Sequence, residues 1–275
     1  MTDVPHTYPH GVPCWVDVES PDPEAAQQFY GGLFGWTFET VTPPGAPPYA
    51  MARLDGADVA GVGPGKAGWS TYIAVDDVDA TAAAVRAAGG TVTAQPEDAG
   101  PGGRDASCLD PARVAFRLWQ ARKRLGAQVV NVPGSWNFSN LHAASPPLEF
   151  YGGLFGWRTL DVGGGSAMVQ VPGYGEHLRT TVDPDILVRQ ADAPDGFADV
   201  VAGVAGPSAD GVSRWNVSFA VADRDSSAAA AEQLGATVLA SIDAYWTRTA
   251  LVRDPGGAVF TLSQFTPPAE GTASS

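Results

Sequence analysis

An eight-residue phrase occurs twice in this chain of 275 residues. Residues 29–36 and residues 150–157 both read FYGGLFGW, at an offset of 121. A self-similar stretch of this length indicates an internal duplication. The match continues downstream, where residues 68–75 resemble residues 214–221. The chain is therefore built from two comparable halves.

The limits of these halves follow from the same comparison. An Asp-Pro pair at Asp110 and another at Asp254 each precede a similar closing segment. The length of 275 residues suits two domains of the usual size. We predict a first domain over residues 11–122 and a second over residues 133–266.

Composition narrows the partners and the compartment. The chain carries 16 basic and 30 acidic side chains, a formal net charge of −14. Such a surface repels phosphate backbones and anionic lipid, so we expect neither nucleic acid nor membrane as a partner. No long apolar run or basic leader is visible, which predicts a cytoplasmic protein. Cys14 and Cys108 are too few for a disulfide framework. Exposed edges of paired strands allow a homodimer.

Each half reads as a strand, a helix and further strands, twice over. Residues 14–18 alternate as a strand, and Asp22-Pro23 begins a helix that ends at Gly35. Shorter strands follow, and the pattern restarts with a strand over residues 71–75 and a helix over residues 77–88. The second domain repeats this order, with its later helix expected over residues 228–234. Each domain thus consists of two βαβββ modules.

Together these features resemble the vicinal oxygen chelate superfamily. The residues concerned are the opening strand, the Asp-Pro helix start, the repeated phrase and the closing DPxxxxFxLxQ pattern. That superfamily includes glyoxalase I, extradiol dioxygenases, and bleomycin- and fosfomycin-resistance proteins. The likeness is strongest to bacterial two-domain glyoxalase-like proteins, often described as hydroxylases. It covers nearly all of residues 11–266. It implies an α+β fold of tandem domains, each an open U-shaped β-barrel with a ligand cleft.

The resemblance also implies where a metal would bind. Metal-using members place His or Glu early in the first strand of each module and Glu in the closing strand. Here the closing strands carry Arg117 and Thr261, and the mid-domain strands begin with Ser70 and Asn216. The opening-strand candidates are Pro13, Trp15, Asp17, Asn137, Phe138 and Asn140. None of these is histidine, and a divalent ion needs three or four donors. We therefore predict no metal and no other cofactor.

An insertion marks the second domain. Residues 50–56 align with residues 167–173 at an offset of 117, but residues 60–62 align at an offset of 142. The rise from 117 to 142 leaves 25 extra residues, near 174–199. A connection of this length is usually functional, and we interpret it as a lid over the second cleft. A surface excursion or an interdomain strut is the alternative.

The insertion also supplies polar candidates. Glu176, His177 and Arg179 are its polar contributors. Histidine is the side chain suited to proton transfer near neutral pH, so His177, with Glu176, is the candidate catalytic acid or base. His6 and His10 lie in the N-terminal tail and are expected to be solvated. His142 is expected just after the first strand of the second domain, in a surface or capping role.

Strand alternation assigns side chains to each cleft. The first cleft is predicted to hold Trp15, Asp17, Tyr72, Arg117 and Trp119. The second is predicted to hold Phe138, Asn140, Asn216, Ser218 and Thr261. Asp17 and Arg117 are interpreted as a buried ion pair, with anion recognition as the alternative. The second cleft is neutral, which suits an uncharged or aromatic small molecule.

Three functions compete at this point. The leading hypothesis is metal-independent binding of such a molecule in the second domain, with or without cofactor-free conversion. The chain would then be a hydroxylase-type enzyme or a binding protein, and the residues leave that choice open. The alternative is a metal-dependent glyoxalase- or dioxygenase-like enzyme with relocated ligands from Asp17, His142, Glu176 and His177. The third is an interaction module whose clefts are filled by side chains.

Overall fold

The computed structural model describes residues 4–43, 45–161, 167–191, 193–244 and 246–266. The first half contains β1 Pro13–Ser20, α1 Pro23–Phe34, β2 Thr37–Thr40, β3 Ala50–Leu54, β4 Ala57–Pro64, β5 Gly68–Ala74, α2 Val78–Ala87, β6 Thr91–Asp98, β7 Gly103–Leu109 and β8 Ala115–Ala121. The second half contains β9 Trp136–His142, α3 Leu148–Phe155, β10 Arg158–Asp161, β11 Ala167–Gln170, α4 Tyr174–Thr180, α5 Ile186–Arg189, the 3-10 helix η1 Phe197–Asp199, β12 Val200–Ala205, β13 Arg214–Ala220, α6 Arg224–Gln233, β14 Thr237–Asp243, β15 Thr247–Arg253 and β16 Val259–Phe265.

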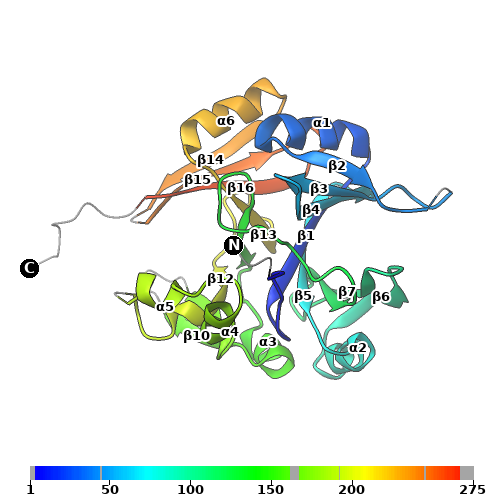
Figure 1. Cartoon of the computed structure of the whole chain (residues 1–275), viewed down its shortest axis with the longest axis vertical. Helices are drawn as coiled ribbons and strands as arrows, with labels where there is room; N and C mark the ends of the chain where they lie inside the picture. Colours follow the sequence, from blue (N-terminus) through cyan, green and yellow to red (C-terminus); the bar gives the residue numbers. More distant parts are fainter. Residues whose placement is uncertain (1–3, 44, 162–166, 192, 245, 267–275) are drawn as a thin grey trace, which may run out of the picture. The chain divides into compact units, whose positions relative to one another are not determined.

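The strands form two mixed sheets of eight strands each (Figure 1). The first has the order β2-β3-β4-β1-β5-β8-β7-β6, and the second has the order β10-β11-β12-β9-β13-β16-β15-β14. The two orders correspond strand for strand, which confirms the duplication and the α+β class. Within the described residues each order ends in two different edge strands, so the sheets are open.

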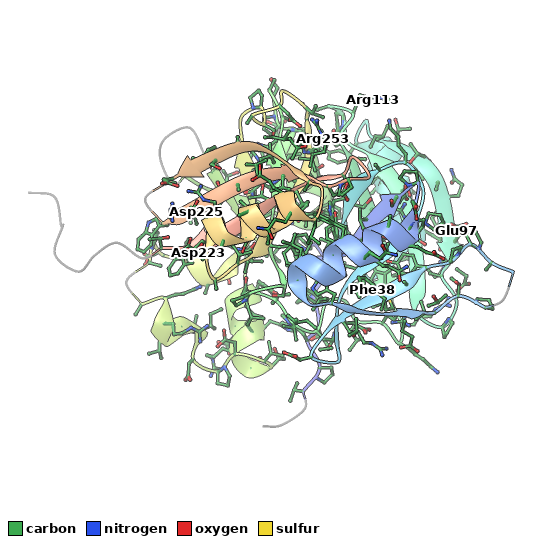
Figure 2. The ribbon with its side chains drawn as sticks, turned by 90° about the horizontal axis from the view of Figure 1, so that it is seen from above. Phe38, Glu97, Arg113, Asp223, Asp225 and Arg253 are labelled. Atoms are coloured by element: carbon green, nitrogen blue, oxygen red, sulfur yellow. The ribbon has the colours of Figure 1, made fainter. Side chains whose placement is uncertain are left out.

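Capping residues explain where most helices begin. The Asp22 carboxylate accepts a hydrogen bond from the Ala25 amide at 3.0 Å and so caps α1. Asp77 caps α2 and Asp223 caps α6 in the same way. Figure 2 shows Asp223 and Asp225 at the start of α6. The prediction that this helix begins at residue 228 was therefore wrong by one turn, because the cap at Asp223 sets its start.

Contacts divide the chain into two compact units, which we call the first unit and the second unit. The first unit comprises residues 1–16, 70–128 and 138–215, and the second comprises residues 17–69, 129–137 and 216–275. Each unit therefore takes most of one module from each half of the duplication. The domain limits at 11–122 and 133–266 stay a prediction.

The core of the first unit lies between its helices and sheet strands. Ile73 on β5 and Phe116 and Leu118 on β8 are buried against α2, which contributes Val78 and Val85. This is the face that strand alternation assigned to the helix. On a strand the next side chains point the other way, so Tyr72 and Arg117 lie on the opposite face of the sheet.

The second unit is built around an aromatic core. Phe34 at the end of α1 has its ring centroid 5.0 Å from that of Phe219 on β13, and Phe260 on β16 packs against both. The helices α1 and α6 lie side by side over these strands (Figure 1). The Trp36 indole donates to the carbonyl oxygen of Gly134 at 2.7 Å, which ties the end of α1 to the connection between the two halves.

Candidate functional site

In the first unit, Arg117 lies on the face of β5 and β8 that alternation assigns to the cleft. Arg117 Nη1 donates to the phenolic oxygen of Tyr72 at 2.9 Å, and its guanidinium lies 5.3 Å from the Tyr72 ring centroid. The two residues are register partners on parallel strands. Asp105 on β7 lies 3.7 Å from Arg117. Trp119 meets Tyr72 edge to face at 6.3 Å. The structure thus brings Tyr72, Arg117 and Trp119 together.

The second unit holds the other polar residue of the first domain. Asp17 on β1 is 2% exposed and accepts a hydrogen bond from the Tyr49 hydroxyl at 3.1 Å. Its register partner on β4 is Gly61, where a Cβ would lie 1.9 Å from the Tyr49 hydroxyl. The glycine therefore makes room for the Tyr49–Asp17 contact. Trp15 belongs to the first unit and Asp17 to the second, and pairing of Asp17 with Arg117 stays a prediction.

Asn216 and Thr261 form the most informative contact of the second unit. Asn216 on β13 is 2% exposed, and its Nδ2 donates to Thr261 Oγ1 on β16 at 2.8 Å. The Asn216 Oδ1 atom is buried and accepts no hydrogen bond from any described residue. Ser218, the register partner of Thr261, is also buried. Two positions predicted from the family pattern are thus bonded directly to each other.

The remaining two predicted contacts lie on β9 in the first unit. Asn140 is the register partner of Gly203 on β12. A Cβ at Gly203 would lie 2.0 Å from Asn140 Oδ1 and 3.1 Å from the Phe138 ring. Gly203 therefore plays the same spatial role here that Gly61 plays beside Tyr49. Phe138 and Asn140 share a face, as alternation requires, and their contact with a ligand stays a prediction.

The insertion forms two short helices and a 3-10 turn between β11 and β12. Glu176 on α4 is held by Arg179, with 2.6 Å between Arg179 Nη2 and Glu176 Oε1, and this hydrogen bond lowers the pKa of Glu176. His177 Nε2 lies 3.1 Å from Thr7 Oγ1 and 3.0 Å from the Thr7 carbonyl oxygen. Its ring stacks on Tyr174. The structure therefore engages His177 with the N-terminal segment, and its catalytic role stays a prediction.

A hollow of about 360 Å³ opens within the insertion itself. Its lining includes Glu176, Leu187, Gln190, Pro194 and Phe197. The Gln190 Oε1 atom is buried and has no partner among the described residues. Residue 192 of the predicted lid lies outside the described residues. The role of the insertion as a lid stays a prediction.

His6 differs from expectation. His6 is 7% exposed, and its ring stacks on Tyr8 with 4.4 Å between centroids. Burial, followed by the charge of His177, lowers the pKa of His6 to about 4. The expectation that His6 is solvated was wrong because residues 6–8 pack onto the first unit, where Tyr8 donates to the Ala127 carbonyl oxygen at 2.7 Å.

The donor set does not fit the divalent metal that the resemblance implies. Arg117 places a cation at one closing-strand position, and it is already bonded to Tyr72. At the other, Thr261 is bonded to Asn216, and amides and hydroxyls are poor ligands for Zn, Fe or Ni. In the part of the chain that the structure describes, no three His, Cys, Asp or Glu side chains are grouped as a metal site requires.

Sequence reasoning missed two residues that contact these candidates. Tyr49 stands at the end of the loop before β3, and nothing in its neighbourhood pointed to Asp17. Asp105 lies on β7, one strand away from Arg117. A cation on a buried strand needs a carboxylate nearby, so the sequence predicts that Arg117 has an acidic partner. Which residue this is depends on the register of β7, which the sequence does not reveal.

Comparisons with known proteins agree with this geometry. The Glyoxalase/Bleomycin resistance protein/Dioxygenase superfamily model matches residues 15–118, and a Glyoxalase-like domain model matches residues 136–263. Protein CFP32 of Mycobacterium tuberculosis is 34% identical over 269 residues, covering 93% of this chain and 95% of that protein. The anthracycline biosynthesis protein DnrV of Streptomyces peucetius is 34% identical over 291 residues, covering 96% and 98%.

A solved structure shares the fold. The Mn(II)-bound glyoxalase of Novosphingobium aromaticivorans matches with a TM-score of 0.59 at 18% identity, over 96% of this chain and 86% of that one. Among the described residues, no helix has the length and apolar character to cross a membrane. Two matched family models, two sheets of equivalent topology and full-length relatives lead to one assignment. The chain belongs to the glyoxalase/bleomycin resistance protein/dioxygenase superfamily, with two such domains in tandem.

Proposed function

We propose that the second domain binds a small uncharged or aromatic molecule without a metal ion, and that any conversion there uses no cofactor. The proposal is carried by Asn216. Its Oδ1 is a buried acceptor with no partner in the described structure, and Thr261 fixes the amide from the other side. Leaving a buried acceptor unsatisfied costs about 1–3 kcal/mol. A ligand that carries a hydroxyl or N–H donor would recover that cost.

The other proposed contacts set the character of the ligand. In the second unit, Ser218 and Thr261 add hydroxyl groups. Phe138 and Asn140, in the first unit, stay predicted contacts from alternation alone. None of these side chains is charged. Apolar walls with a few fixed polar groups are typical of sites for neutral or aromatic molecules. The description of DnrV as an anthracycline biosynthesis protein makes a planar polycyclic aromatic a reasonable first ligand to test.

The test is native mass spectrometry of gently purified protein, with elemental metal analysis of the same sample. We expect no stoichiometric transition metal, and either the bare mass or an adduct of small-molecule size. Fluorescence titration with an uncharged anthracyclinone, an anthracycline without its amino sugar, then measures binding directly. Asn216→Leu should abolish saturable binding, because the buried acceptor is lost.

Asn137→Leu is the matched control. Its Oδ1 is also buried without a described partner, but it alternates with Phe138 and so lies on the other face of β9. Equal loss of binding in both variants would count against the assignment of the face. One equivalent of a transition metal per chain would overturn the proposal and favour the enzyme with relocated ligands.

A further inference from the structure

His142 is the last residue of β9, not a residue beyond it. Its register partner on β12 is Ala205, two residues after Gly203. Alternation along β9 therefore puts His142 on the same face as Phe138 and Asn140. A histidine at this position extends the line of proposed ligand contacts by one residue.

The hydrogen bond of His142 fixes its tautomer. Its Nδ1 lies 2.9 Å from the carbonyl oxygen of Gly206. A carbonyl oxygen only accepts, so Nδ1 carries the hydrogen, and in the neutral ring Nε2 carries the lone pair. No described residue is hydrogen-bonded to Nε2, and His142 is only partly buried. His142 therefore carries a proton acceptor, Nε2, that no described residue uses.

The surroundings keep this imidazole neutral near pH 7. Burial lowers the pKa of His142, and the charge of Arg214 lowers it further. The hydrogen bond to Gly206 and the charge of Asp210 act in the opposite direction, but the net direction is down. A neutral ring at working pH is the form that a general base requires.

Arg214 is the cation whose charge acts on this ring. It is the first residue of β13, the strand next to β9 in the sheet order. Its Nη1 lies 2.9 Å from Asp210 Oδ2, and its Nη2 donates to Ser208 Oγ at 3.1 Å. The loop between β12 and β13 thus fixes the guanidinium. The Nε atom is buried, and no described residue accepts its hydrogen. All four residues belong to the first unit.

We propose that His142 and Arg214 form a proton-transfer site for an acidic hydroxyl, a phenol or an enol, on the bound molecule. The ligand O–H bond breaks, an N–H bond forms at His142 Nε2, and the electron pair stays on the ligand oxygen. No redox partner is needed, and total charge is unchanged. The resulting oxyanion is stabilised by the imidazolium and by the Arg214 guanidinium. The inference rests on the proposed function, because it requires that the second domain bind a small molecule.

The test uses 4-nitrophenol, whose phenolate absorbs visible light and whose neutral form does not. The full-length protein is titrated at a pH where the free probe is mostly un-ionised. We expect saturable binding with the phenolate band in the wild type. His142→Gln should still bind 4-nitrophenol. The ionised fraction of the bound probe should fall about tenfold, which corresponds to a rise of about one unit in the pKa of the bound probe. His10→Gln is the matched control, since His10 also faces a carbonyl oxygen, that of Leu154, but lies elsewhere.

A second measurement does not depend on the probe. Long-range ¹H–¹⁵N spectra of His142 should show the Nδ1–H tautomer and a titration midpoint below that of an ordinary histidine. The double variant Arg214→Gln/Asp210→Asn removes the two charges that act on the ring and should change the titration midpoint of His142. The midpoint should stay below that of an ordinary histidine, because burial is the main cause of the lowered pKa. An Nε2–H tautomer or an ordinary midpoint in the wild type would overturn the inference.

The two proposals fail differently. Bound 4-nitrophenol that stays protonated in the wild type overturns proton transfer and leaves metal-free binding intact. Absence of saturable probe binding up to millimolar concentration also overturns the proton-transfer site. A stoichiometric transition metal in the purified protein overturns the proposed function itself.

Discussion

Tyr151 donates a hydrogen bond to the carboxylate of Asp110 at 3.0 Å, and this contact joins the two halves of the duplication. Tyr151 is the second letter of the repeated phrase, on α3, and Asp110 is the aspartate of the Asp-Pro pair before β8. The Trp215 indole donates to the same Tyr151 hydroxyl at 3.1 Å. Tyr30 repeats the arrangement in the second unit, where it donates to Asp254 at 2.8 Å.

Removing either tyrosine hydroxyl should destabilise the protein. Tyr151→Phe leaves one oxygen of buried Asp110 and the Trp215 indole without their partner, which costs about 1–3 kcal/mol in the free energy of unfolding. Tyr30→Phe should cost a similar amount. Urea unfolding measures both. Tyr174→Phe is the control, since Tyr174 is buried but its hydroxyl has no hydrogen-bond partner among the described residues. Equal losses in all three variants would show that the aspartate contacts contribute little.

The paired glycines should respond to a methyl group. Gly61→Ala pushes the Tyr49 hydroxyl off Asp17, and Gly203→Ala displaces Asn140. We expect each to cost about 1–3 kcal/mol of stability through overpacking. Gly203→Ala should also weaken ligand binding, which Gly61→Ala leaves unchanged.

Gly153→Ala is the matched control for both glycines, because a Cβ there meets nothing within 4 Å inside α3. It should stabilise the protein by about 0.5–1 kcal/mol. Thermal melts give the stability of the three variants, and titration with the anthracyclinone gives their affinity for the ligand. If Gly203→Ala binds the ligand with wild-type affinity, Asn140 is not a ligand contact.

Stability and binding should separate at the Asn216–Thr261 pair. Thr261→Val leaves Asn216 Nδ2 without its acceptor and should cost about 1–3 kcal/mol. Asn216→Leu removes the buried orphan acceptor and should be neutral or stabilising, while binding is lost. Urea unfolding beside the fluorescence titration gives both quantities. A strongly destabilised Asn216→Leu would indicate that the amide serves the fold rather than a ligand.

His6 predicts a loss of stability on mild acidification. Its folded pKa of about 4 lies below the ordinary value of 6.5, so the neutral form is favoured by folding. This stabilisation is fully present above pH 6.5 and is lost as the pH falls towards 4, by about 3 kcal/mol in total. Urea unfolding of His6→Gln should therefore show a weaker fall in stability between these pH values.

His10→Gln serves as the control for this pH series. Carboxylates also titrate towards pH 4, so the quantity compared is the slope of each variant relative to the wild type. If the free energy of unfolding of His6→Gln falls with pH as steeply as that of the wild type, the buried ring of His6 does not cause the loss of stability in acid.

Much of the fold was readable because local signals and the duplication agree. Asp22 and Asp77 cap helices where the pattern placed them, and Gly35 ends α1 in a left-handed conformation. The start of α6 was missed because Arg224 and Asp225 look like loop residues. In the structure Arg224 is buried and donates to the Thr249 carbonyl oxygen at 2.8 Å, a contact that depends on tertiary packing.

The candidate site was readable only in part. Alternation gave the shared faces of Tyr72 with Arg117 and of Phe138 with Asn140, because a period of two needs no tertiary information. It could not give Tyr49 as the partner of Asp17, since that contact depends on a glycine across the sheet. Nor could alternation give the hydrogen bond between Tyr151 and Asp110, because the two residues lie in different halves of the duplication.

The duplicated phrase bears on how relatives of this chain are sorted. Its tyrosines and tryptophans are occupied by packing and by bonds to aspartate or backbone oxygen, so a motif search built on it collects chains that share a scaffold. The proposed ligand contacts lie elsewhere, at alternate positions on β9, β13 and β16. Grouping relatives by the residues aligned with Asn140 and His142, and separately by those aligned with Asn216 and Thr261, would test the proposed contacts, which the phrase itself cannot do.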